Sequence, residues 1–270
     1  MLMRRQVGET VRLRQVVKRV VVGTPVERAA RLMDLWLTGN RNFIYNEQTE
    51  KIIFRVLEVD SNSVDVGTHR GEILETIVKV APKGKHFAFE PIPNLCEELR
   101  NCFPQAEIYN LALSDHAGEE TFIHVLTNPG YSGLRKRQYQ YDEKLEECAV
   151  KTARLDDVIP ESVKISFIKI DVEGAELQVL RGAENVLKRD HPVIVFEHEP
   201  GGALSYGTKP EQVYSFLQNC GLRISLMHDW LEGNAPITKE EFARQFLARK
   251  NYCFVAHGQG VTAPDARRKA

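Results

Sequence analysis

The sequence predicts an α/β fold in which a mainly parallel sheet is covered by helices on both faces. From Ser63 onward, short apolar strands alternate with amphipathic helices, which is the pattern of parallel strands joined by helical crossovers. The clearest instance is 167–187, where an apolar strand leads into an acidic turn and then into a helix with its apolar residues on one face. This turn follows the carboxyl end of a strand, the edge at which open α/β sheets bind ligands.

The individual elements follow from the same periodicities. Strands are expected at 63–66, 86–90, 107–110, 166–171, 193–197, 222–227 and 252–256, and helices at 72–80, 94–103, 175–189 and 210–221. Residues 118–157 depart from the alternation, because 121–126 and 147–155 read as a strand pair around a polar loop that contains glycine. We expect this insertion to overhang the ligand-binding edge.

The first 50 residues predict a helical extension. Residues 1–22 are basic with interleaved valines, which fits either a surface helix that touches a membrane or an acidic partner, or a solvated arm. Thr24 and Pro25 predict the start of a helix that ends before Gly39, and its apolar stripe belongs to the core, to a dimer contact or to a substrate lid. The expected division is therefore an extension over 1–50, the main domain over 51–260 and a flexible tail over 261–270.

The composition is that of an ordinary soluble protein, with 43% hydrophobic and 27% charged residues. The net charge of -1 shows no basic footprint for nucleic acid, and no apolar run is long enough for stable membrane insertion. The five cysteines are odd in number, dispersed and without a CxxC pair, which argues against a disulfide framework and a zinc site. A reducing cytoplasm is the expected location.

Residues 64–71 place a strand, a glycine turn and a helix start in succession. Gly67 and Gly71 allow close approach of the backbone to a ligand, but the GxxxG spacing is not the GxGxxG of a pyrophosphate-binding site. Glu90 closes the next strand, where a carboxylate commonly accepts hydrogen bonds from ribose hydroxyls. An adenosine-containing cofactor bound without phosphate contacts fits this pattern best.

Several motifs together resemble the FkbM family of S-adenosylmethionine-dependent methyltransferases. They are VDVGTHRGE at 64–72, FAFEPIPNLCEELR at 87–100, NLALSD at 110–115, LDDVI at 155–159 and FIKIDVEGAELQVLRGA at 167–183. The resemblance implies the class I methyltransferase fold, a Rossmann-like sheet of seven strands whose seventh runs antiparallel. It also implies S-adenosyl-L-methionine as the cofactor and usually methyl transfer to a hydroxyl oxygen, with sugars and polyketide-like natural products among the acceptors.

The resemblance also implies roles for single residues of this chain. Asp65, Gly67 and Gly71 would contact the amino-acid portion of the cofactor, Glu90 the ribose, Asn110 and Ala112 the adenine, and Asp171 would face the methyl group. Thr68 is also expected among the cofactor-binding residues. Thr68 and His69 stand where Ala and Asn, respectively, are frequent in the family. The 118–157 insertion and the regions outside 60–200 are expected to select the acceptor.

Methyl transfer to an alcohol is an in-line displacement, and the hydroxyl needs a group that orients it or accepts its proton. Asp171 is the first candidate for this role, and His198 is the competing base because an ordinary histidine titrates near neutral pH. Glu173, also a catalytic candidate, and Glu176 could raise the pKa of Asp171 or could simply stabilise the helix start. A divalent cation site formed by Asp171, Glu173, Glu197, His198 and Glu199 is a further alternative, although no metal is expected.

Three functions from different classes remain open at this stage. The first is an S-adenosylmethionine-dependent O-methyltransferase, and the second is a binding module of the same fold without turnover. The third, a nucleotide-dependent oxidoreductase, lacks the glycine pattern it would need. We expect a small-molecule or glycan acceptor and no nucleic acid, and the apolar N-terminal stripe leaves a homodimer as an alternative to a monomer.

Overall fold

The structure is a computed structural model that describes residues 41–139 and 141–259. The chain divides into two compact units, Met1–Glu47 and Gln48–Ala270. Helix α3 (Asn42–Val56) crosses this division, and everything below concerns the second unit. The predicted basic segment at 1–22, the helix expected at 24–39 and the tail at 261–270 lie outside the described residues.

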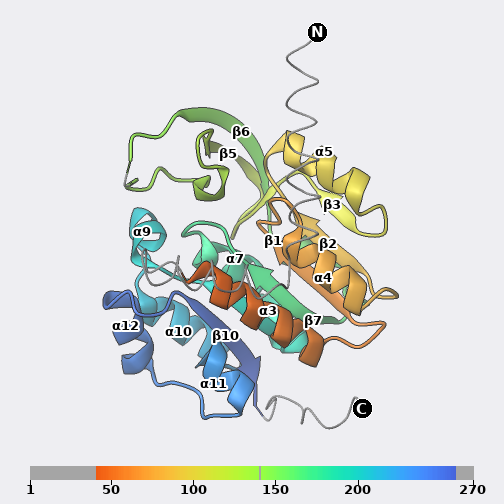
Figure 1. The fold of residues 1–270 in the computed structure, drawn as a ribbon, viewed down its shortest axis with the longest axis vertical. Helices are drawn as coiled ribbons and strands as arrows, with labels where there is room; N and C mark the ends of the chain where they lie inside the picture. Colours follow the sequence, from red (N-terminus) through yellow and green to blue (C-terminus); the bar gives the residue numbers. More distant parts are fainter. Residues whose placement is uncertain (1–40, 140, 260–270) are drawn as a thin grey trace, which may run out of the picture. The chain divides into compact units, whose positions relative to one another are not determined.

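In the described part of the chain, seven strands form one sheet in the order β3-β2-β1-β7-β8-β10-β9 (Figure 1). The strands are β1 (Asn62–Val66), β2 (His86–Phe89), β3 (Glu107–Tyr109), β7 (Ile165–Ile170), β8 (Val193–Glu197), β9 (Leu222–Leu226) and β10 (Cys253–Gly258). The neighbouring pairs β3–β2, β2–β1, β1–β7 and β7–β8 are parallel, whereas β10 runs antiparallel to both β8 and β9. The predicted class I fold, with an antiparallel seventh strand, is confirmed.

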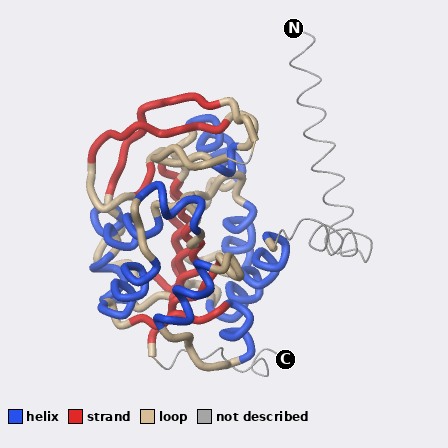
Figure 2. Tube along the Cα trace, turned by 90° about the vertical axis from the view of Figure 1, so that its left-hand side faces the viewer, coloured by secondary structure: helices blue, strands red, loops and turns tan. Residues whose placement is uncertain are grey.

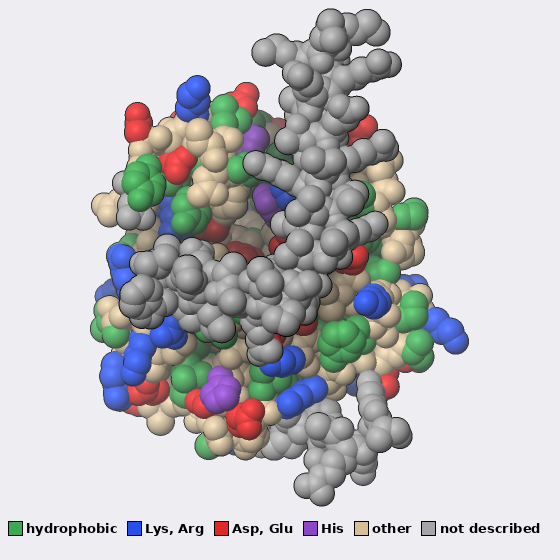
Figure 3. Space-filling model, viewed as in Figure 1, with side chains coloured by type: hydrophobic (Ala, Val, Ile, Leu, Met, Phe, Trp, Pro, Cys, Tyr) green, Lys and Arg blue, Asp and Glu red, His purple; other side chains and the backbone are tan. Residues whose placement is uncertain are grey.

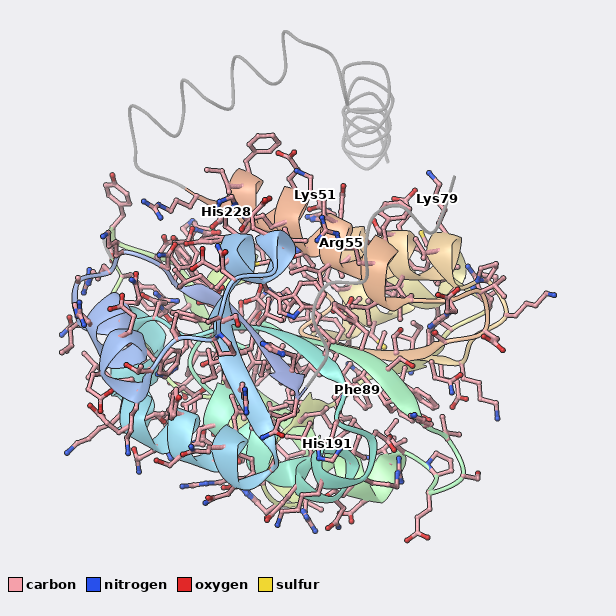
Figure 4. The ribbon with its side chains drawn as sticks, turned by 90° about the horizontal axis from the view of Figure 1, so that it is seen from below. Lys51, Arg55, Lys79, Phe89, His191 and His228 are labelled. Atoms are coloured by element: carbon pink, nitrogen blue, oxygen red, sulfur yellow. The ribbon has the colours of Figure 1, made fainter. Side chains whose placement is uncertain are left out.

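Helices cover both faces of this sheet, as the tube view shows with strands between two helical layers (Figure 2). In Figure 4, Lys51, Arg55 and Lys79 mark α3 and α4 (Glu72–Val80) on one face, while His191, after α8 (Glu184–Asp190), lies on the other. The other helices are α5 (Pro93–Cys102), α6 (Leu155–Val158), α7 (Glu176–Gly182), α9 (Pro200–Ala203), α10 (Pro210–Asn219), α11 (Met227–Glu232) and α12 (Lys239–Leu247), with short 3-10 turns η1 (Pro129–Tyr131) and η2 (Leu204–Tyr206). No helix among these is long and apolar enough to cross a bilayer.

The central strands are apolar because both of their faces are covered. Val64 and Val66 of β1, Ile168 and Ile170 of β7 and Phe196 of β8 belong to one buried cluster. Strands buried on both faces in this way read as nearly continuous apolar runs, which is how the sequence identified them. The core therefore holds the carboxyl ends of β1, β2, β7 and β8 in fixed register.

The single helix predicted over 175–189 was wrong, because the structure has two helices, α7 and α8, with a break at Ala183. A Cβ on Gly182 would lie 2.0 Å from the carbonyl oxygen of Ser114, so α7 packs directly on the Ser114 backbone. The apolar stripe continues across the break through Leu180 and Leu187, both fully buried. The helical periodicity of the sequence therefore does not reveal the break.

The insertion forms a second sheet in the order β4-β6-β5, drawn in green in Figure 1. Its strands are β4 (Ala112–Leu113), β5 (Gly118–Val125) and β6 (Leu145–Ala153). The antiparallel pair β5 and β6 confirms the predicted strand pair, whereas the parallel pairing of β4 with β6 was not anticipated. The loop between β5 and β6 reaches the turn after β7, since Arg137 forms an ion pair with Glu173.

Candidate functional site

The candidate site lies at the carboxyl ends of β1, β2, β7 and β8, where the predicted residues are brought together. In the space-filling view, acidic side chains are visible in a hollow below the surface of the β5–β6 insertion (Figure 3). These strand ends are adjacent in the sheet order, so residues far apart in the sequence meet at one edge. The predicted ligand-binding edge is thus rich in carboxylates.

The turn after β1 joins the turn after β7. The Asp171 N–H donates to the carbonyl oxygen of Val66 at 3.0 Å, and the Gly67 N–H donates to Phe89 at 3.0 Å. Gly67 has φ +76°, and a Cβ there would lie 1.9 Å from the carbonyl oxygen of Asp171. Glycine is therefore required at position 67 by the approach of two backbones.

Asp65 supplies an unused acceptor beside this turn. Its side chain is buried, and its Oδ2 atom has no hydrogen-bond partner among the described residues. Burial, opposed by nearby Lys169, raises the pKa of Asp65 to about 6. A buried carboxylate oxygen without a partner is costly, so it is a natural place for a donor from a bound ligand.

Glu90, after β2, is held by two backbone amides. Its Oε1 accepts from the Ile92 N–H and its Oε2 from the His69 N–H, each at 2.8 Å. Burial raises the pKa of Glu90 to about 7, although both hydrogen bonds favour the ionised form. Each oxygen retains a further lone pair, so the fixed carboxylate can still accept two hydroxyl groups.

Thr68 and Gly71 have local structural partners. The Thr68 hydroxyl donates to the Asp65 carbonyl oxygen at 2.9 Å, which closes the turn. Gly71 has φ +80°, and a Cβ there would meet Phe103 at 2.5 Å and Leu99 at 2.8 Å. The packing of α4 against α5 explains Gly71, and direct contacts of Thr68 and Gly71 with a cofactor stay predictions.

The residues proposed for the adenine lie after β3. The Asn110 side-chain amide donates to the carbonyl oxygens of Glu90 at 3.0 Å and Pro91 at 2.9 Å, which ties the ends of β2 and β3 together. Ala112 is buried in a small cluster with Ile92 and Phe122 below the insertion. Asn110 thus contacts the Glu90 backbone and Ala112 packs with Ile92, while contacts of either residue with adenine stay predictions.

Asp171 forms an ion pair with Lys169. The Lys169 Nζ lies 3.0 Å from Asp171 Oδ2, and the side chains are 11% and 39% exposed, respectively. A ligand can therefore reach Asp171 but hardly Lys169. Burial opposes ionisation of Asp171, yet Lys169 outweighs it and holds the pKa of Asp171 below its ordinary value.

Glu173 and Glu199 share one arginine from the insertion. Arg137 pairs with both carboxylates and lies over the Tyr131 ring, 4.8 Å from its centroid. Glu173 has φ +56°, an uncommon conformation for a residue with a side chain. Burial, together with Asp171, raises the pKa of Glu173 well above its ordinary value, although the pair with Arg137 favours its ionised form.

Glu176 begins α7 and is only 1% exposed. Its Oε1 accepts from the Gly174 N–H at 2.9 Å, while its Oε2 has no partner within the described part of the chain. Burial raises the pKa of Glu176 to about 7. The residue closes the acidic turn, which fits a role at the helix start better than a role in proton transfer.

His198 does not share the environment of the acidic turn. It is fully buried and stacks between Phe242 and Phe246 of α12, with ring centroids 5.7 and 4.7 Å away. Neither ring nitrogen has a hydrogen-bond partner among residues 41–139 and 141–259, and burial lowers the pKa of His198 to about 4. This environment favours a packing role, and catalysis by His198 remains an untested prediction.

Lys169, Arg137 and Glu197 complete the site. Sequence reasoning gave Lys169 and Arg137 no role and considered Glu197 only as a ligand of a divalent cation. Burial and the neighbouring Asp171 raise the pKa of Glu197 well above its ordinary value. A lysine within the apolar strand ISFIKI was the available signal, because a buried lysine needs a partner. Within the described residues, no three His, Cys, Asp or Glu side chains form a group that could hold a metal ion.

Comparison with known proteins gives a consistent result. Residues 65–224 match the family described as "Methyltransferase FkbM domain". The chain is 27% identical to the 2-O-methyltransferase NoeI of Sinorhizobium fredii, over 52% of this chain and 64% of that protein. It is 26% identical to the AMB antimetabolite synthetase AmbE of Pseudomonas aeruginosa, over 65% of this chain and 10% of that protein.

Among solved structures, methyltransferase FkbM from Methylobacillus flagellatus is similar to this chain. The two share 16% identity and a TM-score of 0.46, over 74% of this chain and 44% of the other. The chain thus spans less than two thirds of the length of AmbE, NoeI and this structure.

Proposed function

The chain belongs to the FkbM methyltransferase family, and from this premise we propose that it transfers a methyl group from S-adenosylmethionine to a hydroxyl oxygen. The acceptor in this proposal is a sugar, a glycan or a natural-product small molecule. The name of NoeI, a 2-O-methyltransferase, supports oxygen as the acceptor atom. The five unpaired cysteines support a reducing compartment such as the cytoplasm.

The residues present fit the proposed cofactor. Asp65 offers an unpartnered buried oxygen suited to an ammonium group, and Glu90 offers a fixed carboxylate suited to two ribose hydroxyls. Gly67, which follows β1 in the same turn, has no side chain and packs directly on the backbone of Asp171. When bound, S-adenosylmethionine supplies an electrophilic methyl group on a positively charged sulfur.

The observation that carries the proposal is the contact between the Gly67 turn and Asp171. Because the Gly67 Cα and the Asp171 carbonyl approach so closely, the turn proposed for the cofactor and the carboxylate proposed for the acceptor belong to one rigid edge. Asp171 is partly exposed and ionised, so it can accept a hydrogen bond from an acceptor hydroxyl and fix its direction. Positioning of this kind is the main requirement of an in-line displacement.

Cofactor binding is the first test. Calorimetry with S-adenosylmethionine should show binding to the wild-type chain and about 10- to 100-fold weaker binding to Glu90→Gln, since hydrogen bonds to a charged group contribute about 1.5–3 kcal/mol. Glu107→Gln is the matched control, because Glu107 lies at the start of β3, away from the site, and pairs with the Tyr109 hydroxyl at 2.8 Å. Equal affinities of the two variants would refute the assignment of Glu90.

Turnover is the second test. The chain is incubated with a methyl-labelled cofactor and panels of alcohols, amines and thiols, and mass spectrometry looks for a gain of one labelled methyl. Asp171→Asn should lower turnover of an alcohol by about 100-fold or more while cofactor affinity changes little. Asp157→Asn, an exposed position on α6, should retain full activity. Tight cofactor binding with no product from any panel would favour the alternative, a binding module without turnover.

A further inference from the structure

Polar side chains form two adjacent rows on one face of the sheet beneath the candidate site. Asp65 of β1 lies opposite Lys169 of β7, and Glu197 of β8 lies opposite Cys253 of β10. Ile170 lies opposite Phe196, so the next residues along each strand, Asp171 and Glu197, are also neighbours. Since residues two apart in a strand share a face, Lys169 and Asp171 project on the same side and the two rows share one face.

Among these polar residues, Lys169 has an unusual environment. Its neighbours in β7, Ile168 and Ile170, are in the apolar core on the opposite face, and its own side chain is largely buried. Burial of an ammonium group is unfavourable unless it is paired. Asp171 provides the pair at 3.0 Å, and Asp65 and Glu197 lie on either side. Lys169 therefore remains charged and, being covered, acts on a ligand only through Asp171.

Two neighbouring side chains favour the ionised form of Asp171. Lys169 contacts it from below, and a hydrogen bond with Glu197 also favours its ionised form. Within this pair, burial and Asp171 raise the pKa of Glu197 well above its ordinary value. Two adjacent carboxyl groups with a single lysine beside one of them form an unsymmetrical pair in which Asp171 is the anion.

We propose that Lys169 is a positioning residue for methyl transfer, which holds Asp171 as an oriented carboxylate toward the acceptor hydroxyl. The inference rests on the proposed function for its catalytic consequence, but the state of Asp171 does not depend on turnover. The competing explanation is structural: Lys169 would merely allow neighbouring carboxylates to be buried. That explanation predicts an effect on stability and none on the pH dependence of the reaction.

The charged and titratable groups around Asp171 define what a titration reports. They are Asp65 of β1, His69 in the following turn, Lys169 of β7, Glu173 and Glu176 in the acidic turn, Glu197 of β8 and Cys253 of β10. Lys169 is the cation that contacts Asp171 directly. Its removal should therefore raise the pKa of Asp171, since burial then opposes ionisation and only the Glu197 hydrogen bond and His69 still favour it.

The test follows the Asp171 side-chain carboxyl by carbon-13 NMR, with the signal assigned by its loss in Asp171→Asn. In the wild-type chain the signal should keep its carboxylate position down to about pH 4. In Lys169→Met the midpoint of the Asp171 titration should rise by about 1–3 pH units, whereas in Lys169→Arg this midpoint should stay low. Lys188→Met, which breaks an exposed pair with Glu184, is the matched control and should leave it unchanged.

The outcomes separate the two proposals. Half-protonation of wild-type Asp171 above about pH 4, or an unchanged midpoint in Lys169→Met, would overturn the role of Lys169. If Lys169→Met does not fold, the wild-type titration still decides. With an active acceptor, the acid limb of kcat/KM should move with the midpoint while the cofactor Kd stays within about threefold. A carboxylate signal without methyl transfer to any acceptor would refute the proposed function and retain the electrostatic assignment.

Discussion

Gly67 shows how one missing side chain determines the geometry of the site. A Cβ at this position would overlap the Asp171 carbonyl oxygen at 1.9 Å, and the backbone also has φ +76°. Gly233 separates these two effects, because it has φ +77° with nothing within 4 Å of its Cβ position. Gly67 is thus constrained both by the lack of room for a Cβ and by its positive φ, whereas Gly233 is constrained by its positive φ alone.

Replacement of Gly67 by alanine should therefore cost more stability than replacement of Gly233. We expect a loss of about 3 kcal/mol or more in the free energy of unfolding for Gly67→Ala, and about 1–2 kcal/mol for Gly233→Ala. Urea denaturation of both variants measures the difference. Equal losses would mean that the close approach of the β1 and β7 turns contributes nothing.

At the residue scale, the sequence placed Asp171 at the end of a central strand but did not reveal the groups that contact it. Asp171 could be predicted because an apolar strand ends directly before it, which places it at the ligand edge whatever the rest of the chain does. Arg137 could not, because its pairing with Glu173 spans 36 residues and depends on the path of an irregular loop. The burial of Lys169 could have been predicted, because the strand prediction itself places Lys169 in a buried strand.

At the scale of elements, the loop between β5 and β6 is attached to the acidic turn through Arg137. Loss of this side chain in Arg137→Ala removes two ion pairs and the contact with Tyr131. We expect backbone amides of 129–139 to exchange hydrogen about tenfold faster, a local loss of about 1.4 kcal/mol, with the central strands unaffected.

Hydrogen exchange with mass spectrometry measures this loop directly. Lys136→Ala is the control, because Lys136 is the exposed neighbour of Arg137 in the same loop. If both variants protect 129–139 as the wild-type chain does, Arg137 does not hold the loop. If only Arg137→Ala loses protection, the insertion is positioned over the site by that arginine.

The strands were predicted within one or two residues at most ends, since apolar residues on both faces mark them clearly. The break between α7 and α8 was missed because its cause lies in another element, the Ser114 backbone against Gly182. The pairing of β4 with β6 was missed for the same kind of reason, since a strand of two residues carries no periodicity. Local pattern determines most elements here, and tertiary contacts determine where they break.

At the scale of the whole molecule, buried acids give the stability a characteristic pH dependence. Burial raises the pKa of Asp65 to about 6, and of Glu90 and Glu176 to about 7, above the ordinary values of 3.8 and 4.5. The folded chain therefore binds more protons than the unfolded chain between about pH 4 and 7. Their contribution to stability is present below about pH 4 and is lost as the pH rises toward 7. Asp171 opposes this trend, because its lowered pKa contributes stability above pH 3.8.

Glu176→Gln isolates one of these groups without changing the shape of the side chain. The wild-type free energy of unfolding should decrease between pH 5 and 7.5, and the variant should lose about 3 kcal/mol less over the full titration of Glu176. Urea denaturation at a series of pH values measures both slopes. Glu184→Gln is the control, because Glu184 stays exposed at the start of α8 and should keep the wild-type slope. Parallel slopes for wild type and Glu176→Gln would show that the buried carboxyl of Glu176 ionises as easily in the folded chain as in the unfolded one, and would remove the acidic turn from the account of how pH acts on this protein.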